Sequence, residues 1–111
     1  MQVTFETTDP RAAQLRVQTQ RRVRQALKRL AWLAPRVCVR LSDVNGPRGG
    51  IDKRCQVEVI TDGGTPVVVT SMARDWISAL QGALSRVSRS LLHNLQRHRA
   101  QRRNTPSFAV L

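Results

Sequence analysis

Hydrophobic and polar residues alternate in four short segments of the chain, as expected for strands with one buried side. The segments are residues 2–6, 36–43, 54–60 and 66–71. Their apolar sides carry Val3 and Phe5, then Val37, Val39 and Leu41, then Cys55, Val57 and Val59. Asp62-Gly63-Gly64 joins the last two segments and is typical of a hairpin turn. The pattern predicts a small sheet in which every strand has one apolar face.

Two longer segments have hydrophobic residues at helical spacing. The first follows the turn TTDP and extends from Leu15 to about Trp32, with Pro35 ending it. Its stripe is Leu15, Thr19, Val23, Ala26, Leu27 and Leu30. The second extends from about Arg74 to His98, with the stripe Ile77, Leu80, Leu84, Val87, Leu91 and Leu95. No periodicity remains after Ala100.

The order of these elements is β-α-β-β-β-α. Because each strand has one apolar face and each helix one apolar stripe, both helices must cover the same side of the sheet. We therefore predict the α+β class, as a two-layer sandwich of a four-stranded sheet with two helices on one face. A chain of 111 residues fits one such domain, over residues 1–99, with residues 100–111 as a tail.

The charge of the chain indicates the kind of partner that the protein binds. Lys and Arg total 19 against 7 Asp and Glu, a net charge of +12, and 17 of the 19 bases are Arg. Nine bases and no acid lie between Pro10 and Ser42, and six bases and no acid lie between Trp76 and Leu111. Helical charges are usually balanced by acids one turn away, and here the acids are missing. A polyanion partner is expected, and Arg suits phosphate in particular.

The helical phase of the bases places them on one surface, where that partner would bind. On the first helix Arg21, Arg24 and Lys28 lie opposite the apolar stripe, flanked by Arg22 and Arg29. On the second helix Arg86, Arg89, His93 and Arg97 share a stripe that lies nearly opposite its apolar face. We interpret these residues as an interface for nucleic acid, structured RNA above all. A membrane surface is disfavoured because it would require exposed aromatic residues, and these are expected mostly in the core.

The sequence contains no constellation typical of an enzyme, so we expect no catalytic residues, no metal and no cofactor. His93 and His98 point in different directions on a helix without acids, and Cys38 and Cys55 lie on opposite sides of the sheet. Trp76 is interpreted as a core anchor. Two readings stay open for the glycine-rich loop of residues 45–53: a long hairpin turn, or a basic loop in which Arg48 and Lys53 hold phosphate. The start of the chain lacks a signal peptide, which favours the cytoplasm.

The chain resembles a known family, the short ribosome hibernation-promoting factors, also called ribosome-associated inhibitor A proteins. The resemblance covers roughly residues 1–99. It rests on the opening MQV strand, the spacing Val23, Leu27 and Leu30, Asp75 before the last helix, and the pattern Ala79-Leu80, Ala83-Leu84, Arg86, Val87 and Arg89.

This resemblance implies a β-α-β-β-β-α fold similar to double-stranded-RNA-binding domains. It implies binding to the rRNA of the small ribosomal subunit, where messenger and tRNA bind, and silencing of translation in stationary or stressed cells. It adds Lys53 or Arg54 to the interface, as the basic position after the central loop. The resemblance does not extend to the dimerisation domain of the long family members, so dimerisation of ribosomes by this chain alone is not expected. A monomer is expected when the protein is not bound.

The sequence therefore predicts a non-enzymatic translation inhibitor that binds rRNA, with neither a small-molecule substrate nor a membrane as partner. Two alternatives remain. One is a general binder of double-stranded or structured RNA without a ribosomal site, and the other is a basic module that binds an acidic protein.

Overall fold

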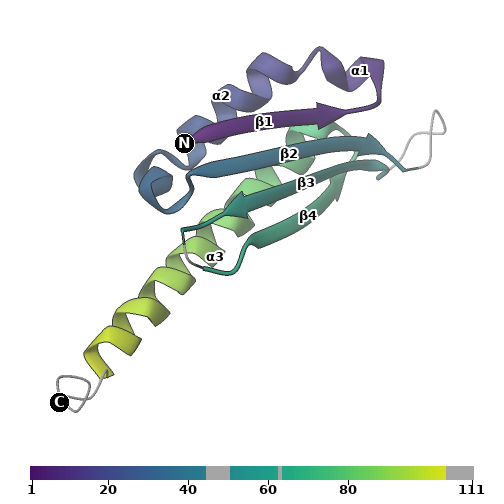
Figure 1. The fold of residues 1–111 in the computed structure, drawn as a ribbon. Coiled ribbons are helices and arrows are strands. Elements are labelled where there is room, and N and C mark those ends of the chain that lie inside the picture. The colour runs from purple at the N-terminus through teal and green to yellow at the C-terminus, as the bar shows by residue number, and fades with distance from the viewer. Residues whose placement is uncertain (45–50, 63, 105–111) are drawn as a thin grey trace.

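The computed structural model describes residues 1–44, 51–62 and 64–104, and their side chains as far as residue 96. The described residues form eight elements, which follow one another along the chain (Figure 1). They are β1 (Gln2–Thr7), α1 (Pro10–Ala13), α2 (Arg16–Ala26), the 3-10 helix η1 (Lys28–Leu33), β2 (Arg36–Asp43), β3 (Lys53–Ile60), β4 (Val67–Ala73) and α3 (Trp76–Asn104). The strands therefore lie within two residues of their predicted ends.

The four strands form one mixed sheet in the order β1-β2-β3-β4. β1 pairs with β2 in parallel, with Val3 opposite Val37, and the helical segment between them provides the crossover that a parallel pair needs. β2, β3 and β4 pair antiparallel, with Val39 opposite Val57 and Val57 opposite Val69. In this register the predicted apolar sides of the first three strands fall on one face of the sheet, together with Val67 and Val69 of β4.

A single core joins that face to both long helices, which lie behind the sheet in Figure 1. α2 packs over β1 and contributes Val23, while α3 packs over β3 and β4. The buried residues of α3 are Trp76, Ala79, Leu80, Ala83, Leu84, Val87 and Leu91. The predicted α+β class is confirmed: a four-stranded sheet with helices packed on it.

The segment predicted as one helix from Leu15 to about Trp32 is instead two pieces, α2 and η1, and the continuous helix was wrong. α2 ends at Ala26, and the backbone of Leu27 (φ −105°, ψ 14°) begins a 3-10 helix. With three residues per turn, side chains three apart point the same way. Leu30 and Leu33 are both half-buried at such a spacing, whereas Trp32 is 64% exposed. The expectation that the core takes most aromatic residues therefore fails at Trp32.

The last helix begins later and extends further than the predicted segment from Arg74 to His98. Asp75 caps its start, because Oδ1 accepts a hydrogen bond from the backbone N–H of Ser78 at 2.8 Å. This bond lowers the pKa of the Asp75 carboxyl. The helix continues to Asn104, into the predicted tail, and extends past the sheet in Figure 1. Residues 105–111 of that tail lie outside the described residues.

An ionic cluster surrounds Trp76 where β2 ends and β3 begins. The indole N–H of Trp76 donates to the backbone oxygen of Ser42 at 2.9 Å, and the ring is 8% exposed. Arg11 and Lys53 lie over the Trp76 ring, 5.6 and 5.3 Å from its centroid. Both cations also bind the carboxylate of Asp43, at 2.7 and 2.9 Å. Trp76 is thus the core anchor that the sequence predicted.

Candidate nucleic-acid interface

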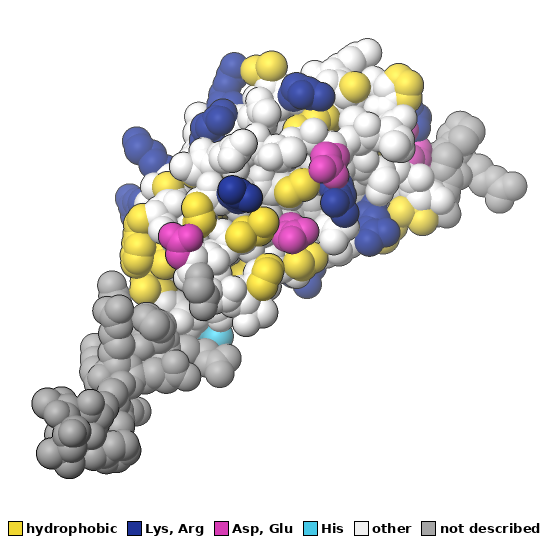
Figure 2. All heavy atoms as spheres, in the orientation of Figure 1, with side chains coloured by type: hydrophobic (Ala, Val, Ile, Leu, Met, Phe, Trp, Pro, Cys, Tyr) yellow, Lys and Arg dark blue, Asp and Glu magenta, His cyan; other side chains and the backbone are white. Residues whose placement is uncertain are grey.

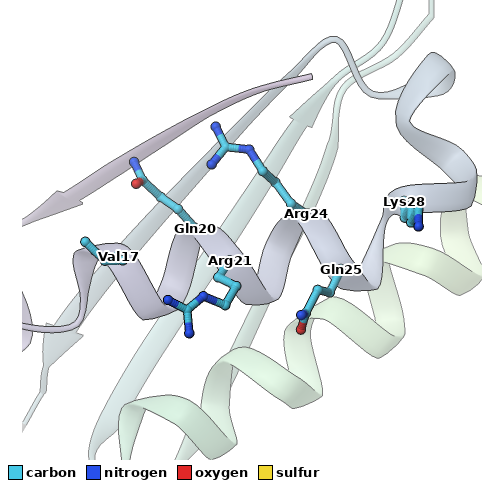
Figure 3. A pocket seen from close by; sticks show the side chains of 6 residues that line it. All are labelled: Val17, Gln20, Arg21, Arg24, Gln25 and Lys28. Atoms are coloured by element: carbon cyan, nitrogen blue, oxygen red, sulfur yellow. The ribbon is translucent and has the colours of Figure 1, made fainter.

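The outer surface of α2 and the start of η1 bring together the three bases that the sequence assigned to the first helix. Arg21, Arg24 and Lys28 are exposed and line one open depression of about 510 Å³. Arg21 extends toward α3 in Figure 3, whereas Arg24 extends to the side where β1 lies. Val17, which is 65% exposed, also lines this depression. The helical phase read from the sequence therefore placed these three bases correctly on the solvent side.

Glutamines separate the bases on this surface, and the sequence analysis did not single them out. Gln20 and Gln25 line the same depression, and Gln20 also donates from Nε2 to the backbone oxygen of Val3 at 3.5 Å. A second open depression of about 580 Å³ adjoins it, lined by Gln14, Val17, Gln18, Arg21, Arg22 and Gln25. Spacing alone could have found Gln18 and Gln25, since residues seven apart share one side of a helix.

The bases of α3 lie in two different environments. Arg89 and His93 are exposed. Arg86 is also exposed, but its Nη1 donates to the backbone oxygen of Thr70 on β4 at 2.9 Å. Since β4 is the sheet edge opposite β1, Arg86 lies on the side of α3 away from α2. The backbone of Arg97 belongs to α3, and its side chain lies outside the described residues.

The bases of α2 and η1 have no acidic partners within the described part of the chain. Every ion pair found there involves Arg11, Arg40 or Lys53. The helices α2, η1 and α3 contain no Asp or Glu at all. Such a density of like charge destabilises the folded state until an anion neutralises it. The helix layer therefore has the electrostatics of a polyanion-binding surface.

Lys53, by contrast, belongs to the ionic cluster around Trp76. Its side chain is 14% exposed, and its ammonium lies 2.9 Å from Asp43 and 3.2 Å from Asp52, whose side chain is fully buried. The hydrogen bond to Asp43 raises the pKa of Lys53. A cation so enclosed by carboxylates is already neutralised, and we exclude it from the interface. Arg48, its companion in the phosphate-loop reading, lies outside the described residues.

The opposite face of the sheet differs in charge from the helix layer. Figure 2 shows basic, acidic and hydrophobic side chains intermixed on it. Arg40 binds Glu6 there at 2.6 Å, across the β1–β2 pair. Arg54 is exposed, and strand alternation puts it on this face because its neighbour Cys55 is in the core. The sequence expectation grouped Arg54 with the helix bases, and the fold separates them.

The remaining reactive groups of the described region do not gather into a site. No three His, Cys, Asp or Glu side chains there are arranged to hold a metal ion. Cys55 is buried in the core, and burial raises the pKa of its thiol to about 12. Cys38 points to the other face of the sheet, as predicted. None of the helices described has an apolar stretch long enough to cross a membrane.

Comparison with known proteins does not assign this chain to a family. A scan against protein-family models matches no family, and a search of curated proteins matches none.

Proposed function

We propose that this protein binds structured RNA through the outer surface of its helix layer. The observation that carries the proposal is a group of helix bases without acidic partners in the described region: the exposed Arg21, Arg24, Lys28, Arg29 and Arg89, and the half-buried Arg22. Phosphates would supply the missing negative charge, and the release of their counterions would drive binding. Guanidinium groups favour this partner because they bind phosphate through two parallel hydrogen bonds.

The RNA we propose is the rRNA of the small ribosomal subunit, in the cytoplasm, near the sites of messenger and tRNA. This part of the proposal rests on the resemblance of residues 1–99 to the short ribosome hibernation-promoting factors. The protein would act by occupying these sites and so silence idle ribosomes, without catalysing a reaction. The mixed charge of the open sheet face suits it to remain in solvent while the helix layer faces the RNA.

Sedimentation with ribosomes through a sucrose gradient tests the proposal. We expect the protein to migrate with the small subunit and intact ribosomes at low salt, less so at moderate salt, and not when tRNA fills its sites. The double variant Arg21→Glu/Lys28→Glu should stay at the top of the gradient, because two phosphate contacts become repulsions. A circular dichroism spectrum like that of the wild type would show that the variant is folded.

A matched control reverses two charges on the opposite face of the sheet. Arg36 and Arg54 are both exposed there, so Arg36→Glu/Arg54→Glu removes the same charge without touching the helix layer. We expect this variant to bind ribosomes nearly as the wild type does, apart from the weaker long-range attraction. Loss of binding in this control but not in Arg21→Glu/Lys28→Glu would show that the interface lies on the sheet face instead. Binding that bulk duplex RNA competes away completely would favour a general RNA binder.

A further inference from the structure

We infer that Trp32 is a stacking platform for an unpaired RNA base, at the end of the helix layer formed by η1. This inference rests on the proposed function and names the kind of RNA that the site recognises. It begins from the exposure of the side chain. Trp32 is 64% exposed, whereas Phe5 and Trp76, the other aromatic residues in the described region, are 6% and 8% exposed.

The geometry of η1 explains why Trp32 points outward. In a 3-10 helix, side chains at i and i+3 lie on the same side. Leu30 and Leu33 form the half-buried side, and Leu30 packs against the core. Arg29 and Trp32 form another side, and both are exposed. The backbone therefore directs an indole ring and a guanidinium into solvent next to each other.

The charge around Trp32 indicates which chemical group would stack on its ring. η1 has two bases, Lys28 and Arg29, and no acid. Lys28 also lines the depression on α2 with Arg21 and Arg24, so the basic surface continues to the turn that carries Trp32. In the described region, cations lie over the rings of Trp76 and Phe5, and none over Trp32. An exposed indole in these surroundings suits a neutral, planar group that is linked to a phosphate, and the base of a nucleotide is such a group.

An unpaired base fits this site better than a paired one. A base within a duplex is already stacked on both sides, so an aromatic side chain gains contact only with bases in loops, bulges or ends. Stacking on an aromatic side chain contributes about a tenfold increase in affinity or more for each base, without choosing its sequence. The bases of α2 would hold the phosphates of a structured RNA while Trp32 selects the place where a base is unstacked.

The test measures the affinity of the full chain for two labelled RNAs, over the same series of salt concentrations for both: a hairpin with unpaired adenines in its loop, and a fully paired duplex of the same stem. We expect Trp32→Ala to weaken hairpin binding roughly tenfold and to leave duplex binding unchanged. Trp32→Phe should retain most of the affinity, since a ring remains. The salt dependence of hairpin binding should not change, because no cation is lost. The hairpin, but not the duplex, should quench tryptophan fluorescence.

Val68→Ala provides the control, because Val68 is also exposed (52%), lies on the opposite face of the sheet and has no ring. It should bind both RNAs like the wild type. Equal affinity of Trp32→Ala and wild type for the hairpin would overturn the inference, as would an equal loss for hairpin and duplex. A second experiment measures binding to vesicles of phosphatidylserine and phosphatidylcholine. Binding to them that requires Trp32, without any effect of Trp32 on RNA, would identify a membrane contact instead.

The failure of this inference can be told apart from the failure of the proposed function. If Arg21→Glu/Lys28→Glu abolishes ribosome association and Trp32→Ala has no effect on either RNA, the proposed function stands and the stacking site falls. If the wild type binds neither ribosomes nor RNA, the proposed function falls, and the inference falls with it.

Discussion

Arg86 in α3 donates a hydrogen bond from Nη1 to the backbone oxygen of Thr70 in β4, at 2.9 Å. β4 is an edge strand, and the outward backbone groups of an edge strand are open to pairing with other chains. The guanidinium covers one of these groups. Arg86 thus serves the fold as well as the charge of the surface, which the phase of the sequence did not reveal.

This bond predicts different behaviour for two neighbouring bases of α3. Arg86→Ala should lower the free energy of unfolding by about 0.5–1.5 kcal/mol, because the Thr70 oxygen loses its donor. Arg89→Ala, which removes an exposed base one turn away, should change it by less than about 0.5 kcal/mol. Urea unfolding followed by circular dichroism measures both. Equal stability of the two variants would mean that the bond to Thr70 contributes nothing in solution.

The two lysines of the chain should have opposite roles. Lys53→Met removes the ammonium that faces the buried carboxylate of Asp52, and a buried charge without its partner destabilises strongly. We expect its melting temperature to fall by several degrees and its RNA affinity, measured on folded protein, to stay near that of the wild type. Lys28→Met should lower RNA affinity and its salt dependence and leave the melting temperature unchanged. Thermal melts and binding titrations on both variants check the contrast; a loss of affinity in folded Lys53→Met would return this residue to the interface.

The two tryptophans provide a second contrast, this time in stability. Trp76→Phe removes the indole N–H that donates to the Ser42 oxygen and leaves space in the core. It should cost about 1–3 kcal/mol of unfolding free energy. Trp32→Phe should cost less than about 0.5 kcal/mol, because Trp32 is exposed. Chemical denaturation of the two variants measures both changes in unfolding free energy. A large decrease for Trp32→Phe would show that the ring of Trp32 is packed in solution.

Alkaline pH should destabilise the protein through Cys55. The ordinary pKa of the thiol, 9.0, applies to the unfolded chain, and burial raises it to about 12 in the fold. Between these pH values the unfolded state loses a proton that the folded state keeps, so stability falls as pH rises from about 9 towards 12. The slope approaches about 1.4 kcal/mol per pH unit.

Urea unfolding at pH 8, 9 and 10 under reducing conditions measures this slope below the pH range in which the Lys53 ammonium of the folded protein loses its proton, since its pKa is raised. Cys55→Ala should be less stable than the wild type at pH 8 and show a flatter dependence on pH. Cys38→Ala is the matched control, and it should keep most of the slope. An unchanged slope in Cys55→Ala would assign the alkaline loss of stability to other groups.

Part of the candidate interface could be predicted from the sequence. Arg21, Arg24 and Lys28 lie on one surface because helical phase depends only on spacing within one element. Lys53 and Arg54 could not be assigned in this way. Lys53 is neutralised by Asp43, ten residues before it, and Arg54 is directed away from the helices by the alternation of β3. Both outcomes depend on contacts between elements, which no local pattern contains.

The sequence by itself determined the four strands, the two helical regions, the apolar faces and the absence of acids from the helices. These features follow from periodicity and composition along the chain, where each residue is compared only with its near neighbours. Tertiary structure alone decided the change from α2 to a 3-10 helix, which exposes Trp32, and the contacts of Arg86 and Lys53. A backbone changes its helix type to satisfy packing on the sheet, and a long basic side chain binds whichever oxygen the fold brings within reach. The physical reason for the division is range: spacing encodes local geometry, whereas partners distant in sequence meet only after folding.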